Sequence, residues 1–319
     1  MRPVVIAHRG ASGHLPEHTI PAKALAYAMG ADYLEQDIVA TRDDALIVVH
    51  DIHLDLVTNV ATRFPGRNRE DGRYYARDFD LAEILTLKVH ERTNAKGEPA
   101  FPGRFQSDGE PFRIHTLERE LELVVTLREN GTRPIGIYPE IKDPQWHQEE
   151  GIDITRLVLE TLARFGYREH QDPVYLQCFD ERELRRVRHD LDSRLKLVQL
   201  IGEDSWTPEP TEFATMQTMA GLEKLAETVD GIGPWLQQLY GIGPDGAIED
   251  QGLVSRAHEQ GLVVHPYTFR SDALPRGFTT FDDLLDFMVD DLAIDGLFTD
   301  FPDAAFRFLQ QRHNVAAAD

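Results

Sequence analysis

Short apolar runs recur along the whole chain, and amphipathic stretches lie between them. Buried strands of a parallel sheet read as continuous apolar runs, so these runs predict strands. The runs are Val4–His8, Tyr33–Val39, Ile135–Ile141, Val174–Cys178, Leu195–Ile201, Gly231–Gly233, Leu262–Tyr267 and Gly296–Thr299. Helical spacing is found in Pro21–Met29, Ile154–Phe165, Glu181–Leu191 and Leu222–Val229. The alternation predicts an α/β fold, and eight β units indicate closure into a TIM-type (β/α)8 barrel.

Residues 52–112 interrupt this alternation. They hold dense turn signals, such as Pro65-Gly66 and Pro102-Gly103, and few strand signals. We therefore expect one catalytic barrel domain over residues 1–319, with 52–112 as a small insertion on the barrel rim after the second strand. Its aromatic and arginine content favours a lid or wall of a site, and a surface loop without a role is the alternative.

The composition excludes several classes of protein. A net charge of −22 argues against nucleic-acid binding, because no basic patch could gather enough phosphate contacts. No apolar stretch approaches 18 residues, so no membrane span is expected. No basic region precedes the apolar run that starts at Val4, so we expect a cytosolic chain or a mature form that has lost a leader. The single cysteine, Cys178, fits both compartments, and we interpret it as structural.

Three carboxylates end predicted strands. Glu35 and Asp37 are separated by one residue, so both point to the same face of their strand. Two carboxylates aimed together repel, and one stays protonated unless a cation lies between them. Glu140, at the end of another strand, adds a third oxygen ligand. The set predicts one divalent metal, and oxygen ligands favour Ca²⁺ or Mg²⁺ over zinc. The alternative is a group of solvated strand-end acids.

Two histidines, His8 and His50, also close apolar runs. We expect each run to be a strand that carries its histidine to the same rim. A pair of imidazoles can serve as general acid and general base, because their pKa lies near operating pH. Asp51 either orients an imidazole or caps the next turn.

Two cations complete the predicted site. Arg9 could grip phosphate oxygens with its planar fork, and Lys142 would act as a point charge. Together with one divalent metal, the positive charges of Arg9 and Lys142 exceed the negative charge of the three carboxylates. The site would then suit an anionic phosphodiester, although the protein surface is acidic. The alternative for Lys142 is a structural ion pair with Glu35 or Glu140.

Other strand ends offer residues that could line a pocket for an alcohol. Packing at the top of the barrel explains each of them equally well. The candidates are Gln177, Phe179, Trp235, Tyr267 and Phe298.

Together these motifs resemble the glycerophosphodiester phosphodiesterases, specifically the long bacterial periplasmic type. The resemblance rests on motifs in family order along the whole chain. They are His8-Arg9-Gly10-Ala11-Ser12-Gly13, Pro16-Glu17-His18-Thr19, Tyr33-Leu34-Glu35-Gln36-Asp37, Val49-His50-Asp51, Tyr138-Pro139-Glu140-Ile141-Lys142, His265-Pro266-Tyr267-Thr268 and Leu297-Phe298-Thr299-Asp300-Phe301-Pro302. His18 replaces a common Asn, and His115 replaces a common Pro; we expect neither change to touch the chemistry.

The resemblance implies a TIM-type barrel, Ca²⁺ or in some members Mg²⁺ on Glu35, Asp37 and Glu140, and a periplasmic location. It implies that His8 and His50 are the acid–base pair and that Arg9 contacts the phosphate. The implied substrate is a small glycerophosphodiester such as glycerophosphocholine, which would give glycerol 3-phosphate and an alcohol.

Two other functions fit parts of the sequence. A metal-dependent sugar-phosphate isomerase or aldolase could use the three carboxylates on an enediolate, but it leaves Arg9 and the histidine pair without a joint role. A catalytically inactive binding protein on the same scaffold need not retain both histidines, so their joint presence argues against it.

Overall fold

Eight parallel strands form the centre of the protein. The computed structural model describes residues 2–106, 111–206 and 212–316. The strands are β1 (Val4–Ala7), β2 (Tyr33–Ala40), β4 (Gly136–Ile141), β5 (Tyr175–Cys178), β6 (Lys196–Ile201), β7 (Gly231–Pro234), β10 (Val263–Val264) and β11 (Gly296–Thr299). They pair in the order β10-β7-β6-β5-β4-β2-β1-β11. All eight predicted strands are therefore present, and the order is that of an opened barrel.

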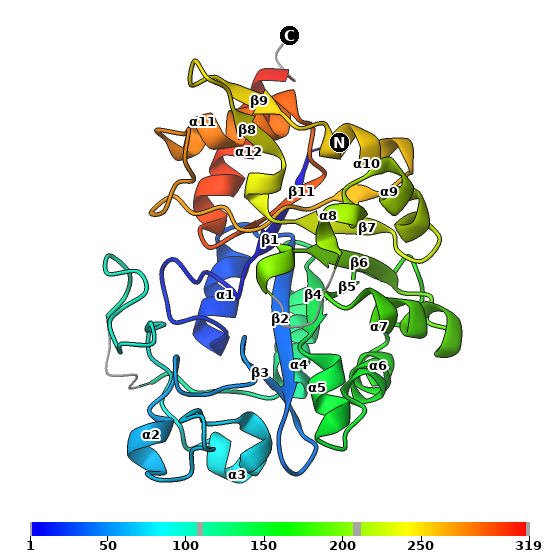
Figure 1. Ribbon diagram of the computed structural model, residues 1–319. Helices are drawn as coiled ribbons and strands as arrows, with labels where there is room; N and C mark the ends of the chain where they lie inside the picture. Colours follow the sequence, from blue (N-terminus) through cyan, green and yellow to red (C-terminus); the bar gives the residue numbers. More distant parts are fainter. Residues whose placement is uncertain (1, 107–110, 207–211, 317–319) are drawn as a thin grey trace.

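The gap between β10 and β11 is closed by hydrogen bonds outside the regular strands. The Asp295 N–H donates to the Val264 carbonyl (3.1 Å), and the Phe298 N–H donates to the Pro266 carbonyl (3.1 Å). The sheet is thus a nearly closed (β/α)8 barrel, which confirms the predicted TIM-type fold class. The helices surround these strands in Figure 1.

Three further strands lie outside the barrel among the described residues. β3 (Leu46–Val48) runs antiparallel to β2, and β8 (Tyr240–Ile242) forms a hairpin with β9 (Ile248–Asp250). The run before His50 is therefore a strand, as expected, but it is antiparallel to β2 and lies outside the barrel, which corrects the expectation that parallel strands carry both histidines. His50 still reaches the rim, since the Val49 N–H donates to the carbonyl of Asp37 in β2 (2.9 Å).

Helices follow most strands and cover the outside of the barrel (Figure 1). The α-helices are α1 (Ile20–Ala28), α2 (Val60–Arg63), α3 (Leu81–Ile84), α4 (Leu117–Asn130), α5 (Pro144–Glu149), α6 (Ile154–Arg164), α7 (Glu181–Arg185), α8 (Phe213–Met216), α9 (Met219–Ala226), α10 (Leu253–Glu259), α11 (Phe281–Asp286) and α12 (Pro302–Ala316). Short 3₁₀ turns are η1 (Ala76–Asp78), η3 (Asp204–Trp206) and η4 (Leu236–Gln238), and π-helical turns η2 (Arg186–Asp190) and η5 (Phe287–Asp291) extend α7 and α11.

The predicted helices match these elements closely, with one shift. The helix expected at Leu222–Val229 is α9, which begins three residues earlier because the Thr218 hydroxyl accepts the Gly221 N–H (3.1 Å) and caps it.

A layer of aromatic side chains fills the barrel interior. Tyr138 is fully buried, packs edge-on against Phe298, and its hydroxyl lies 2.8 Å from His265 Nδ1. Burial lowers the pKa of His265 to about 4, so this imidazole is neutral in the folded protein.

Residues 52–112 pack around a hydrophobic cluster separate from that of the barrel. This cluster includes Leu54, Phe79, Leu87 and Phe112, together with Ile47 from β3. Helices α2 and α3 lie in this segment, shown in light blue and cyan at the lower left of Figure 1. The expected insertion thus has a small core of its own, beside the rim that carries the candidate site.

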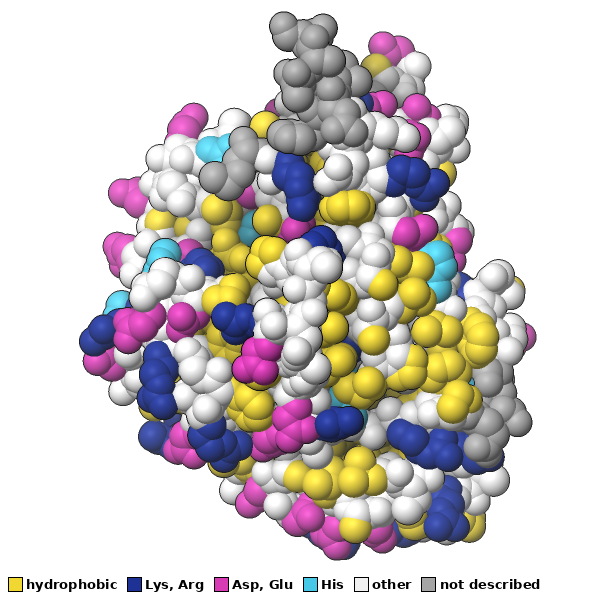
Figure 2. Space-filling view, turned by 180° about the vertical axis from the view of Figure 1, so that it is seen from behind, with side chains coloured by type: hydrophobic (Ala, Val, Ile, Leu, Met, Phe, Trp, Pro, Cys, Tyr) yellow, Lys and Arg dark blue, Asp and Glu magenta, His cyan; other side chains and the backbone are white. Residues whose placement is uncertain are grey.

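The surface mixes charges of both signs. Figure 2 shows acidic side chains spread over the far face, with hydrophobic ones gathered mainly over its right half. None of the helices in the described part of the chain is long and apolar enough to cross a membrane.

The buried His265 predicts acid sensitivity. Its pKa is about 4 when folded and about 6.5 when unfolded. The unfolded state therefore binds more protons in this window, and stability falls as pH drops from about 6.5 to 4. We expect H265Q to show a smaller loss of unfolding free energy over this window than wild type, measured by chemical denaturation. H170Q, at an exposed position, is the control; equal losses in H265Q and wild type would contradict the assignment.

Candidate functional site

The turn after β1 places the first two functional side chains. Arg9 adopts a left-handed conformation (φ 59°), followed by Gly10 at φ 88°. A Cβ on Gly10 would lie 2.9 Å from the backbone of Ala22 in α1, so only glycine fits here. The turn aims the Arg9 N–H at Glu35 Oε2 (2.7 Å), which joins the end of β1 to the carboxylates of β2.

Glu35, Asp37 and Glu140 form one buried cluster. Asp37 of β2 is paired in register with Glu140 of β4, and Glu35 lies on the same face of β2 as Asp37. Each offers an oxygen within 4.8 Å of the others, and all three side chains are buried. The structure thus brings the three predicted ligands together.

The pKa values of the three carboxylates show the cost of burying them together. Burial, reinforced by Asp37 and Glu140, raises the pKa of Glu35 well above its usual range. Burial also raises the pKa of Glu140 to about 8, although Lys142 opposes the change. For Asp37 burial acts in the same direction, but Lys142 and His18 outweigh it and hold the pKa of Asp37 well below its usual range. Burial and mutual repulsion therefore oppose ionisation of all three carboxylates at once unless positive charge lies between them.

A divalent cation fits this cluster. Asp37 Oδ1 is buried and has no hydrogen-bond partner among the described residues, so it is free to bind an ion. A cation would stabilise the ionised forms of Glu35 and Glu140, and oxygen ligands match a hard ion such as Ca²⁺ or Mg²⁺. The cluster could hold a metal at the rim of the barrel.

Each of the two predicted histidines is paired with an aspartate. His8 Nδ1 lies 2.5 Å from Asp300 Oδ1, and His50 Nδ1 lies 2.7 Å from Asp51 Oδ1. An ionised carboxylate only accepts hydrogen bonds, so Nδ1 carries the proton in both rings. Nε2 is then the nitrogen that can take or give a proton at the site.

Both imidazoles are neutral without substrate. Burial, reinforced by Arg9, lowers the pKa of His8 to about 3 despite Asp300. Burial, with Arg9 and Lys142, also lowers the pKa of His50. A neutral Nε2 can act as a base directly, and an approaching anion would favour the protonated form required of an acid.

The two predicted cations occupy different surroundings. Arg9 Nη1 lies 3.0 Å from Glu17 Oε2, while Arg9 Nε is buried with no hydrogen-bond partner among the described residues. Lys142 Nζ lies 2.7 Å from Glu140 Oε1, so the ion pair weighed as an alternative for Lys142 is present. Both side chains nevertheless line one cavity with the histidines.

That cavity has a volume of about 370 Å³. All of the predicted pocket residues border it, although Gln177 and Phe298 are themselves almost fully buried. The predicted residues along its wall are His8, Arg9, Glu35, Asp37, His50, Glu140, Lys142, Gln177, Phe179, Trp235, Tyr267 and Phe298. The site thus combines charged groups and aromatic rings in one cavity, as small-molecule sites do.

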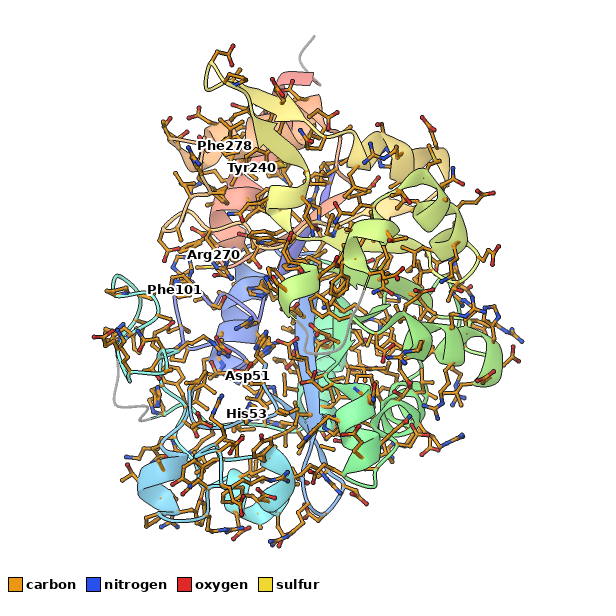
Figure 3. The ribbon with its side chains drawn as sticks, viewed as in Figure 1. Asp51, His53, Phe101, Tyr240, Arg270 and Phe278 are labelled. Carbon is orange, nitrogen blue, oxygen red and sulfur yellow. The ribbon has the colours of Figure 1, made fainter. Side chains whose placement is uncertain are left out.

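Several residues near the site were missed by sequence reasoning. Asp300 lies in the motif that ends β11, whose sequence predicts no role for it, yet its carboxylate holds His8. Arg270, labelled in Figure 3, borders the cavity and donates to Asp300 Oδ2 (2.7 Å). The expectation that His18 does not touch the chemistry is contradicted, because His18 Nε2 lies 2.6 Å from Asp37 Oδ2. No spacing in the sequence signals these contacts, since each joins distant segments.

Known proteins resemble this chain over nearly its full length. Residues 8–304 match the model of the glycerophosphoryl diester phosphodiesterase family. A Haemophilus influenzae glycerophosphodiester phosphodiesterase is 41% identical, over 96% of this chain and 90% of that one. A crystal structure of a Silicibacter pomeroyi protein assigned to this activity is similar with a TM-score of 0.72, at 23% identity, and covers 98% of this chain and 94% of its own.

A second solved structure carries a bound molecule. It is an Oleispira antarctica phosphodiesterase in complex with the product sn-glycerol-3-phosphate. It matches this chain with a TM-score of 0.62 and 20% identity, over 97% of both chains.

The contact of His18 with Asp37 predicts an effect on ion binding. Partners of a ligating carboxylate orient it, and their loss costs roughly 10- to 100-fold in metal affinity. We expect H18A to weaken Ca²⁺ binding by about this factor, measured by calorimetric titration of metal-stripped protein. H14A, on the same loop but paired with Asp303, is the matched control. Unchanged affinity in H18A would show that Asp37 needs no such partner.

Proposed function

Since the chain belongs to the glycerophosphoryl diester phosphodiesterase family, it is a glycerophosphodiester phosphodiesterase, and we propose that it works with one divalent cation and two histidines. The observation that carries this proposal is the convergence of His8, His50 and the three carboxylates on one cavity. The products we propose are glycerol 3-phosphate and an alcohol, with glycerophosphocholine as a representative substrate.

Glu35, Asp37 and Glu140 are the proposed ligands of the cation, with Ca²⁺ preferred and Mg²⁺ as the alternative. When bound, such an ion neutralises charge on the phosphate as the transition state forms. Gln177 supports this arrangement, because its Nε2 donates to Glu35 Oε1 (3.1 Å) and holds that carboxylate in place. The Arg9 N–H holds the other oxygen of Glu35.

Arg9 and Lys142 are the proposed phosphate contacts. Arg9 Nε lies 3.8 Å from Asp37 Oδ2 but makes no hydrogen bond among the described residues, and Arg9 borders the cavity, so its guanidinium has a donor for a non-bridging phosphate oxygen. Lys142 contributes positive charge beside it while remaining bonded to Glu140. These donors are held in place before substrate arrives, so little reorganisation accompanies the build-up of charge.

His8 and His50 share the two proton transfers. One Nε2 accepts the proton of the nucleophile, which is either the neighbouring glycerol hydroxyl or water. The other imidazole, protonated, donates to the oxygen of the leaving alcohol as the P–O bond breaks. Attack by the glycerol hydroxyl would give a cyclic phosphate, which water then opens with the two roles reversed.

The aromatic residues of the cavity are the proposed contacts of the organic part of the substrate. Phe179, Trp235 and Tyr267 offer rings in the same cavity as the charged groups, which suits the carbon skeleton of glycerol or of the alcohol. The bound product in the Oleispira antarctica relative is consistent with a glycerol phosphate occupying such a cavity.

Release of glycerol 3-phosphate from glycerophosphocholine, followed by a coupled enzymatic assay, tests the proposed reaction. Sugar-phosphate isomerisation is measured on the same sample. Release without isomerisation supports the proposal; isomerisation without release favours the metal-dependent isomerase; binding of the diester with neither reaction favours the binding protein.

Loss of either histidine is expected to slow turnover. H8A and H50A each remove one proton transfer, so each should lower kcat by at least about 10²-fold. H189A, which removes a histidine that contacts Thr228 instead of the site, should keep wild-type kcat. Turnover close to wild type in H50A or H8A would remove that residue from the mechanism.

Substrates with different leaving groups can show which histidine is the general acid and which is the general base. An aryl leaving group departs without a proton, so the variant that lacks the general acid should recover much of its rate on a nitrophenyl ester of glycerol phosphate. The variant that lacks the general base should stay slow on both substrates. Steady-state kcat on the alkyl and aryl esters measures this difference, and equal losses in both variants would contradict separate acid and base roles.

A further inference from the structure

Arg104, from the 52–112 segment, reaches the partner of His8. Its Nη2 lies 2.7 Å from Asp300 Oδ2, while the other oxygen of Asp300 holds His8. The pair is almost fully buried, with 4% and 2% of the two side chains exposed. Arg104 is itself fixed by Asp272 (2.8 and 3.0 Å) and by the ring of Phe101, 3.7 Å from its guanidinium carbon. Figure 3 shows Phe101 and Arg270 close together.

Arg92, from the same segment, reaches the partner of His50. Its Nη1 lies 2.8 Å from Asp51 Oδ2, while Asp51 Oδ1 holds His50. Its Nε and Nη2 make a two-pronged contact with Glu17 (2.8 and 2.6 Å). Glu17 in turn pairs with Arg9, so Arg92 is linked to both the histidine and the proposed phosphate contact.

The two arrangements share one pattern: an imidazole Nδ1, an aspartate and an arginine of residues 52–112. We propose that Arg104 and Arg92 are positioning residues, which fix Asp300 and Asp51 and thereby orient His8 and His50. This inference rests on the proposed acid–base roles of the histidines. It also gives residues 52–112 a function, since this segment supplies one arginine contact to the aspartate behind each histidine.

Electrostatics favour this role over simple packing. If Asp300, whose side chain is 2% exposed, accepted only one imidazole N–H, its remaining lone-pair sites would lack partners, which is costly away from water. The cost is smaller for Asp51, whose side chain is 24% exposed. Arginine meets that need with several fixed donors and stays charged under all working conditions. Asp300 receives this support from Arg104 and also from Arg270, whereas Asp51 receives its arginine contact from Arg92.

The two arginines should affect catalysis in different ways. R104A removes one partner of the aspartate that holds His8, so we expect kcat to fall by at least about tenfold, with KM within about twofold of wild type because, among the described residues, Arg104 makes no hydrogen bond or ion pair with Arg9 or Glu17. R92A acts through His50 and also frees Glu17 beside Arg9, so kcat should fall and KM should rise, each by about tenfold. R92K and R104K keep the positive charge without the planar guanidinium, so they should lose less activity than the alanine variants. They replace an alanine variant in these tests if thermal melting shows that it does not fold.

The decisive readout is the dependence on the leaving group. If each arginine acts through its own histidine, the arginine that supports the general acid should shift the ratio of kcat on aryl and alkyl esters as loss of that histidine does. The other arginine should leave the ratio unchanged, as loss of the general base does. A loss of stability alone would lower kcat on both esters equally and leave the ratio unchanged in both variants. The double variant H8A/R104A should turn over no more slowly than H8A.

R73A is the matched control, because Arg73 lies in the same segment and pairs with Asp55 at 2.8 Å. It should retain the wild-type ratio and KM. Unchanged kcat in R104A and R92A, or the same ratio in both as in wild type, would overturn the inference while H8A and H50A still support the proposed function. Full activity in H8A and H50A would instead overturn the proposed function and, with it, this inference.

Discussion

Three buried carboxylates at the rim of the barrel are the constraint around which the site is built. Glu35, Asp37 and Glu140 are brought together by the register of β2 and β4, and their mutual repulsion must be offset by donors and positive charge. The chain supplies part of that offset through the Arg9 N–H, His18 and Lys142. One divalent cation would supply the positive charge that is still needed. The repulsion between the three carboxylates therefore also explains why this cluster is the proposed ion site.

A second layer of charges surrounds this centre. Asp300 and Asp51 hold the two imidazoles, and arginines neutralise these aspartates in turn. Although the chain carries a net charge of −22, Arg9, Arg92 and Arg104 lie beside the site and have mostly covered side chains, which pair with carboxylates there. An acidic protein can thus present a local field suited to a phosphodiester, because paired charges near the cavity outweigh distant, solvent-screened ones.

The eight barrel strands, the carboxylate cluster and both histidines could be predicted from the sequence, because apolar runs and strand periodicity are local signals. The antiparallel course of β3 could not, since the short run Leu46–Val48 reads like any buried strand and pairing direction depends on the whole sheet. The roles of Asp300 and His18 were missed because their partners lie 292 and 19 residues away. Choice of headgroup and the compartment stay predictions, as no local pattern encodes them.

A Ca²⁺ titration of metal-stripped protein, with melting temperature and glycerol 3-phosphate release measured on the same samples, tests the central claim most directly. If the carboxylate cluster needs the ion to relieve its repulsion and to act on phosphate, both quantities should rise together over one concentration range. E140Q should lose the coupled response. Full activity of metal-stripped protein in the presence of chelator would contradict the account, as would a melting temperature that neither Ca²⁺ nor Mg²⁺ changes.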